Sequence, residues 1–194
     1  GTLTTNGIAT QLQTVARMIA ARNTLGLKRQ VFFVSVGGFD THDAQNRGQA
    51  DLMARLSHAL AYFDGALAGI AGDGGAADVR HQATLFTASD FGRTYTTNGD
   101  GTDHGWGGHH FILGGAVKGR ALYGSYPTVG VSGSTAGFEN PDEVGSGSWL
   151  PSTAVDQYSA TLGKWFGISD ANLDLLFPNL GNFGTRDLGF LNAG

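Results

Sequence analysis

Short apolar runs without polar alternation are the feature that most constrains the fold of this chain. Residues 31–36 read Val-Phe-Phe-Val-Ser-Val and are followed by a Gly-Gly pair. Residues 83–88 and 110–113 form two further runs that are mostly apolar. Runs of this length that lack a period of two are typical of strands covered on both faces, as in a parallel sheet. We therefore expect three buried strands.

Helical periodicity occurs before the first of these runs, between the first and the second, and after the third. Apolar residues recur at helical spacing at Ile8, Leu12, Val15 and Ile19, and again from Leu52 to Ile70. They predict one amphipathic helix over about residues 5–23 and a second over the later stretch. Two short helices are expected near the end of the chain. One spans residues 153–166, with Thr153 and Asp156 as a capping box, and the other runs from residue 169 to before Pro178.

The order of strands and helices predicts an α/β fold with a mostly parallel open sheet flanked by helices. The length of 194 residues fits a single domain, and no internal repeat divides residues 1–194. Residues 120–150 are rich in Gly and Ser, and we expect them to be irregular. The 32 glycines predict many tight loops.

Composition and missing motifs exclude several functional classes. The formal net charge is -4 and the Lys and Arg residues are scattered, so nothing favours a nucleic-acid partner. No apolar run approaches the roughly 18 residues that a membrane span needs. The absence of cysteine excludes disulfides and thiolate metal sites. Neither a GxSxG elbow nor a phosphate-binding GxxxxGK[ST] loop is present.

Potential metal ligands gather beside the predicted strands. Two follow the first strand, one follows the second, and four come immediately before the third. In chain order they are Asp40, His42, Asp90, Asp103, His104, His109 and His110. Ligands of open α/β sheets collect beyond the carboxyl ends of the strands, so we expect these side chains to meet at one rim. Carboxylate oxygen and imidazole nitrogen suit zinc, manganese or iron.

Each of these residues also has a structural interpretation. Residues 40–43 could cap the helix that follows, and a lone Asp or His in a loop is more often solvated than a ligand. Residues 98–103 are similar to a calcium loop but lack its downstream Glu, so a glycine-rich turn is the better interpretation. Arg93 could contact an anion, cap a helix or pair at the surface. The alternatives stay open at this point.

Four motif groups together resemble a known bacterial family. They are residues 34–42 (VSVGGFDTH), 87–94 (TASDFGRT), 101–110 (GTDHGWGGHH), and a tail that starts at 149–158 (WLPSTAVDQY). This series resembles the family called domain of unknown function 1501 across nearly the whole chain. That family is similar to the alkaline-phosphatase and sulfatase superfamily, which implies an alkaline-phosphatase-like sheet. Its members are about twice this length and commonly carry a twin-arginine export signal. The resemblance therefore implies the C-terminal half of a longer protein that is periplasmic or secreted.

The resemblance also implies metal ligands. Asp40, His42 and His104 match the first metal site of the superfamily. Asp90 matches one ligand of the second site, but Phe91 stands where the superfamily has a histidine. One ligand is therefore missing, and the number of divalent ions, one or two, stays open.

Two functions follow from the resemblance. The first is a metal-dependent hydrolase-like protein that acts on a small anionic phosphate or sulfate ester. Arg93 would assist the anion, and His109 or His110 would replace the missing ligand. The nucleophile would lie outside this chain, so we expect the chain alone to be inactive. The alternative is a non-catalytic exported binding or assembly protein that retains the fold. Open sheet edges would let the chain self-associate through an exposed strand.

Overall fold

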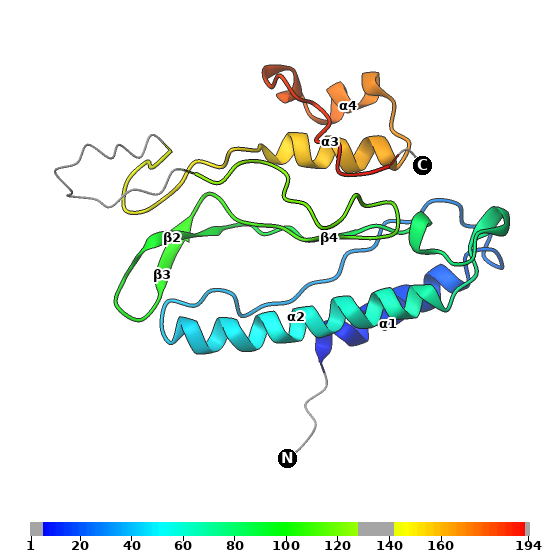
Figure 1. The fold of residues 1–194 in the computed structure, drawn as a ribbon, viewed down its shortest axis with the longest axis horizontal. Helices are drawn as coiled ribbons and strands as arrows, with labels where there is room; N and C mark the ends of the chain where they lie inside the picture. The colour runs from blue at the N-terminus through cyan, green and yellow to red at the C-terminus, as the bar shows by residue number, and fades with distance from the viewer. Residues whose placement is uncertain (1–5, 128–141, 193–194) are drawn as a thin grey trace, which may run out of the picture. The chain divides into compact units, whose positions relative to one another are not determined.

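The computed structural model describes residues 6–127 and 142–192, which fall into two units. Unit 1 comprises Gly1–Phe86 and Ile112–Val117, and unit 2 comprises Thr87–Phe111 and Lys118–Gly194. The predicted irregular stretch 120–150 includes residues 128–141, which lie outside the described residues. Both units are labelled by their elements in Figure 1.

Unit 1 is built on two helices that lie side by side, α1 (Gly7–Ala20) and α2 (Gln45–Ala68) (Figure 1). Their facing sides form the core because apolar residues recur every three or four positions. The buried members of this core are Ile8, Leu12, Ala16, Ile19, Ala59, Phe63, Leu67 and, from the segment after α2, Val79. Both helices confirm the prediction from periodicity.

The remaining elements of unit 1 are short. The 3-10 helices η1 (Asp73–Gly75) and η2 (Arg80–Gln82) follow α2. Strands β1 (Leu85–Phe86) and β4 (Ile112–Leu113) then pair in antiparallel fashion. Leu85 packs against the helical core, so this small sheet covers one part of it.

A buried arginine ties α1 to the segment after α2. The side chain of Arg22 donates hydrogen bonds to both carboxylate oxygens of Asp73, at 3.1 and 2.7 Å. It also donates to the carbonyl of Ala71 at 2.8 Å. These hydrogen bonds hold the pKa of Asp73 below its usual value. Arg22 thereby holds the C-terminal end of α1 to the segment that follows α2.

The predicted parallel sheet is wrong. Within the described residues the structure contains only two antiparallel sheets of two strands each. Residues 31–36 are extended but form no ladder, and the run 83–88 pairs over two residues only, with β4. An apolar run satisfies the local requirement for a strand, but a sheet also needs a partner for every peptide group. The α/β, alkaline-phosphatase-like architecture is therefore not the fold of this chain.

Unit 2 combines a hairpin with a small helical core. Its elements are β2 (Gly92–Thr97), β3 (Thr102–Gly105), α3 (Val155–Trp165), α4 (Asp170–Leu176) and η3 (Leu180–Asn182). The core between the helices is formed by Ala160, Leu173 and Leu180, with Ile168 and Phe177 at its margin. Both predicted C-terminal helices are confirmed. Of the hairpin, sequence patterns predicted only the glycine-rich turn at residues 98–103 and neither of its strands.

Helix α3 begins one residue later than its predicted capping box requires. Its N-cap is Ala154, and the side-chain oxygen of Gln157 accepts a hydrogen bond from the Ala154 N–H at 3.0 Å. The box of Thr153 and Asp156 is therefore wrong. The reciprocal contact of a capping box comes from its third helical residue, and here that residue is Gln157.

Candidate metal centre

The loop before α2 holds a carboxylate and an imidazole together. His42 Nε2 lies 2.9 Å from Asp40 Oδ1, and the two side chains are 44% and 60% exposed. Between them, the Thr41 N–H donates to the carbonyl of Phe39 at 2.9 Å, which closes a tight turn. The turn explains how two residues separated by one position face each other. The pair is open to solvent, as a site for an exchangeable ligand must be.

Helix α2 starts directly after this loop. Its N-cap is Ala44, which has a left-handed backbone (φ 47°) and makes no side-chain cap bond of its own. None of residues 40–43 is therefore the N-cap residue itself. The carboxylate of Asp40 lies against His42.

The Asp40–His42 pair fits a divalent cation. Zinc binds histidine nitrogen and carboxylate oxygen at about 2.0 to 2.2 Å, so two ligands of a tetrahedral site lie about 3.4 Å apart. The observed 2.9 Å is close to that value, and a movement of about half an ångström would admit an ion. Two ligands are fewer than a structural site needs, so further ligands would have to complete the shell.

Two opposed glycines set the geometry of the hairpin in unit 2. Gly92 of β2 pairs with Gly105 of β3. A Cβ atom at Gly105 would lie 2.8 Å from the carbonyl oxygen of Arg93, and one at Gly92 would lie 1.7 Å from the carbonyl oxygen of Gly107. Only glycine permits this approach of the backbones. The glycines of the motifs around residues 92 and 105 therefore have a steric cause.

The hairpin presents three of the motif side chains together. Arg93 pairs with His104 across the strands. The rings of Phe91 and His104 are stacked, with centroids 4.0 Å apart and planes within 3°. The guanidinium of Arg93 lies 5.9 Å from the Phe91 ring, and its Nε donates to Thr102 Oγ1 at 2.9 Å. Arg93 thus links the two strands, while Phe91 fixes the ring plane of His104.

The turn of the hairpin confirms the glycine-rich interpretation of residues 98–103. The side-chain oxygen of Asn98 accepts a hydrogen bond from the Gly101 N–H at 2.9 Å. Gly99 adopts a φ of 122°, which favours glycine. Asn98 and its glycines therefore act as turn residues and connect β2 to β3.

A second histidine cluster follows the hairpin. His109 lies against Tyr126, with ring centroids 5.1 Å apart. His110 lies against Tyr158, and its Nδ1 is 3.4 Å from the hydroxyl of Thr87. Tyr158 donates a hydrogen bond to the carbonyl of Thr87 at 3.1 Å, and burial raises the pKa of Tyr158 to about 12. Partial desolvation, and then the neighbouring His109, lower the pKa of His110. Both effects favour the neutral form of the His110 imidazole.

The predicted site residues are divided between the units. Asp40 and His42 belong to unit 1, and Asp90, Arg93, His104 and His109 belong to unit 2. The structure joins the first two as a pair and places Arg93 beside His104 on the hairpin. Asp90 lies exposed ahead of β2. A shared ion for all of these ligands stays a prediction.

Sequence reasoning missed the partners of His110. Tyr158 lies 71 residues from Thr87 along the chain. No local spacing could connect these positions. Tyr158 also stands on the apolar face of a predicted helix, where an aromatic residue is ordinarily part of a core.

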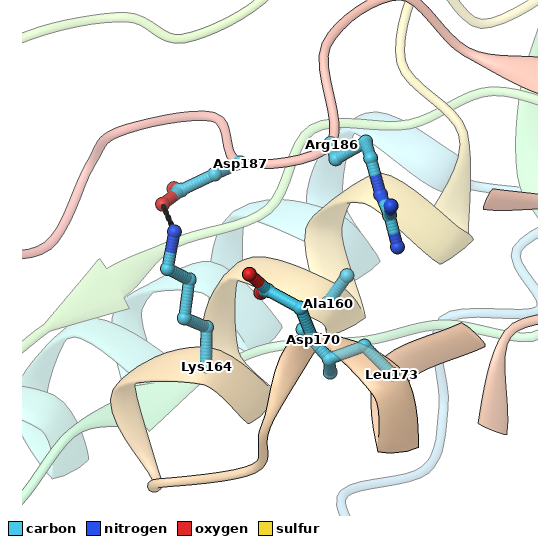
Figure 2. Close-up of a pocket in the computed structure, with 6 residues that line it drawn as sticks. All are labelled: Ala160, Lys164, Asp170, Leu173, Arg186 and Asp187. Atoms are coloured by element: carbon cyan, nitrogen blue, oxygen red, sulfur yellow. Dashed lines mark ion pairs between the residues drawn. The ribbon is translucent and has the colours of Figure 1, made fainter. Parts of the chain in front are cut away.

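The cavity drawn in Figure 2 lies in unit 2 and has a volume of about 150 Å³. Its lining consists of Ala160, Lys164, Asp170, Leu173, Arg186 and Asp187. Lys164 forms an ion pair with Asp187 at 3.2 Å, and Arg186 pairs with Asp174. The cations of this cavity are therefore neutralised within the chain, and none of the predicted metal ligands lines it.

Comparison with known proteins settles the family. A family described as "Protein of unknown function (DUF1501)" matches residues 2–176. The chain belongs to the DUF1501 family. The DUF1501 match contains the Asp40–His42 pair and the hairpin, and it ends at the last residue of α4. No curated protein and no solved structure matches the chain. None of the helices in the described ranges is long and apolar enough to cross a bilayer.

Proposed function

We propose that this DUF1501 protein is a metal-dependent, hydrolase-like protein for phosphate or sulfate esters, located in the periplasm or secreted. The Asp40–His42 pair carries the proposal, because its two donor atoms lie 2.9 Å apart and remain accessible. Asp90, His104 and His109 are the further ligands proposed for one or two ions of zinc, manganese or iron. A bound divalent ion would polarise the ester oxygen and stabilise the charge that develops on it.

The side chains of the hairpin would orient the substrate and one ligand. Phe91 holds the plane of the His104 ring through the 4.0 Å stack, so the imidazole cannot swing freely on χ2. Arg93 would contribute the positive charge that attracts the small anionic ester, while its Nε bonds to Thr102 Oγ1 and keeps the side chain on the hairpin. These roles explain why Phe91, Arg93 and His104 lie on one hairpin.

Metal binding by the purified chain tests whether the Asp40–His42 pair is part of a metal site. We expect calorimetry to detect zinc or manganese, and Asp40→Asn or His42→Asn to weaken the affinity at least tenfold. Asp43→Asn is the matched control, because it removes an equal charge from the same loop without touching the pair. Equal affinities for all variants would contradict the proposal.

Activity is a separate measurement. We assign residues of this chain to metal and anion binding and none of them to the nucleophile. The purified chain should therefore bind metal and leave aryl phosphates and aryl sulfates intact. Turnover that a chelator abolishes would show that a nucleophile is present after all.

The alternative function is that of a non-catalytic exported binding or assembly protein. One observation favours it: the Phe91 ring covers one face of His104, at the position where a second metal site would need a ligand. Elemental analysis distinguishes the two functions. Protein that retains no metal after purification and binds none on addition supports the alternative.

A further inference from the structure

Residues 31–36 of unit 1 form an extended segment whose two faces differ in their surroundings. Phe32 and Val34 pack against the helical core. Val31 and Phe33 point the other way and are 81% and 92% exposed. This alternation is that of a β-strand, in which successive side chains point to opposite faces. Two large apolar side chains consequently lie in water on the outer face.

The side chain of Gln11 forms two hydrogen bonds to the backbone of this segment, in the pattern that a neighbouring strand would form. The side-chain amide of Gln11 donates to the Ser35 carbonyl at 2.9 Å and accepts from the Ser35 N–H at 3.1 Å. A neighbouring antiparallel strand would make the same two bonds to one residue. In the described part of the chain, the other peptide groups of residues 31–36 enter no backbone hydrogen bond.

The two edges of the segment are therefore unequal. In an extended chain the N–H and C=O groups of one residue share an edge, and those of the next residue use the opposite edge. Gln11 stands at the edge used by residues 31, 33 and 35. The peptide groups of residues 32, 34 and 36 face the other edge, which presents a row of donors and acceptors. Such an edge is a template for an added strand.

We propose that a second copy of this chain pairs with that edge, antiparallel, about a two-fold axis at Phe33. In this register Phe33 lies opposite Phe33 of the second copy, and residue 32 lies opposite residue 34. Every core-facing side chain then meets another core-facing side chain, so the helices of both copies cover the same face. The exposed phenyl rings meet on the outer face as a cross-strand aromatic pair.

Charge selects the same arrangement. Lys28 and Arg29 precede the segment, and Asp40 and Asp43 follow it. Antiparallel pairing brings the cationic end of one copy to the anionic end of the other, at both ends of the interface. Parallel pairing would place cations against cations, which is unfavourable. The interface is isologous and closes at two copies. The proposal does not rest on the proposed hydrolase function, and its tests need neither bound metal nor activity.

Sedimentation velocity over a range of concentrations tests the dimer. We expect a monomer–dimer equilibrium that Phe33→Lys abolishes, because two ammonium groups would then meet at the axis. Phe33 is 92% exposed, so the unit should still fold, and circular dichroism checks this. Leu175→Lys is the matched control, since Leu175 is 80% exposed in unit 2. A monomer at all concentrations, open-ended oligomers, or a dimer that Phe33→Lys leaves intact would each overturn the proposal.

Oxidative cross-linking tests the register, and the chain has no native cysteine to interfere. Directly opposed residues of a non-hydrogen-bonded pair have Cα atoms about 4.5 Å apart, within the range of a disulfide. Phe33→Cys should therefore form a covalent dimer rapidly. Val31→Cys should not, because its two copies would lie about 14 Å apart along the strands. Cross-linking of Val31→Cys as fast as that of Phe33→Cys would exclude the two-fold at Phe33.

Discussion

The two units reach stability by different means. Unit 1 buries eight apolar residues between two long helices and a short connection. Unit 2 buries only three in its helical core. Side chains of α3 hold the irregular segment that follows η3: Thr161 accepts a hydrogen bond from the Leu188 N–H, and Gln157 donates one to the Thr185 carbonyl. The difference teaches that the candidate ligands are held in two ways. Asp40 and His42 stand at the start of a helix with a large apolar core, whereas His104 depends on a hairpin of opposed glycines.

The unfolding of each unit can be measured with a different spectroscopic signal. Helices α1 and α2 contain 14 and 24 residues, whereas α3 and α4 contain 11 and 7, so far-UV circular dichroism reports mainly unit 1. All three tryptophans, Trp106, Trp149 and Trp165, belong to unit 2. Tryptophan fluorescence therefore reports unit 2 alone. Coincident transitions in urea would show that the units unfold as one.

The largest effect is expected from Phe63→Ala in unit 1. Phe63 is 4% exposed, and its truncation leaves a cavity between α1 and α2. We expect a loss of about 3 to 5 kcal/mol in the free energy of unfolding, measured by circular dichroism in urea. The neighbouring Tyr62→Ala is the control, with less than about 1 kcal/mol. Equal losses for both variants would refute a core centred on Phe63.

Leu180→Ala should give the next largest effect, this time in unit 2. Leu180 is fully buried among the helices of that unit. We expect about 2 to 5 kcal/mol less stability by tryptophan fluorescence. Leu175→Ala, at a position 80% exposed, should leave the transition nearly unchanged. If circular dichroism shifts as much as fluorescence, the units are coupled rather than independent.

Thr161→Val examines the hydrogen bonds that replace apolar burial in unit 2. The Thr161 hydroxyl accepts from the Leu188 N–H at 2.9 Å and donates to the Gln157 carbonyl at 2.8 Å. Valine has nearly the same shape but leaves the Leu188 N–H without its acceptor, so we expect the free energy of unfolding to fall by about 1 to 3 kcal/mol. Thr161→Ser keeps the hydroxyl and should retain most of it. A stable valine variant would show that these bonds contribute little.

The smallest effect is a pH dependence confined to unit 2. His110 has a pKa below its ordinary 6.5, so the unfolded chain binds more protons than the folded one as pH falls through 6.5. Stability from this group is fully present above pH 6.5 and declines as pH falls towards the folded pKa. The urea midpoint by fluorescence should decrease over this window, and His110→Gln should remove the decrease. An NMR titration of His110 above 6.5 would contradict the sign.

Local patterns predicted the helices but not the pairing of strands. Ile8, Leu12 and Ile19 lie on one face of α1, as their spacing indicates, because helical contacts are local. Residues 31–36 are extended, as their composition indicates. Their hydrogen-bond partners depend on distant chain segments, which no run of apolar residues specifies. The sheet inferred from such runs was wrong for that reason.

In the candidate site, too, contacts between residues close in sequence were predictable and contacts between distant residues were not. Asp40 and His42 are one residue apart, so a single turn brings them together and the sequence could indicate the pair. The hairpin that carries His104 was missed, because opposed glycines leave no trace in a pattern of hydrophobicity. The contacts of His110 with Tyr158 link distant positions and were equally invisible.

The opposed glycines of the hairpin make folding and chemistry separable by mutation. Alanine at position 92 or 105 would push two backbones apart, so it should be rejected by any selection for folded protein. Substitutions of the Phe91 and His104 rings that these glycines bring together alter no backbone spacing. A library sorted first for solubility and then for metal uptake would therefore separate the residues that shape the scaffold from those that act on a ligand.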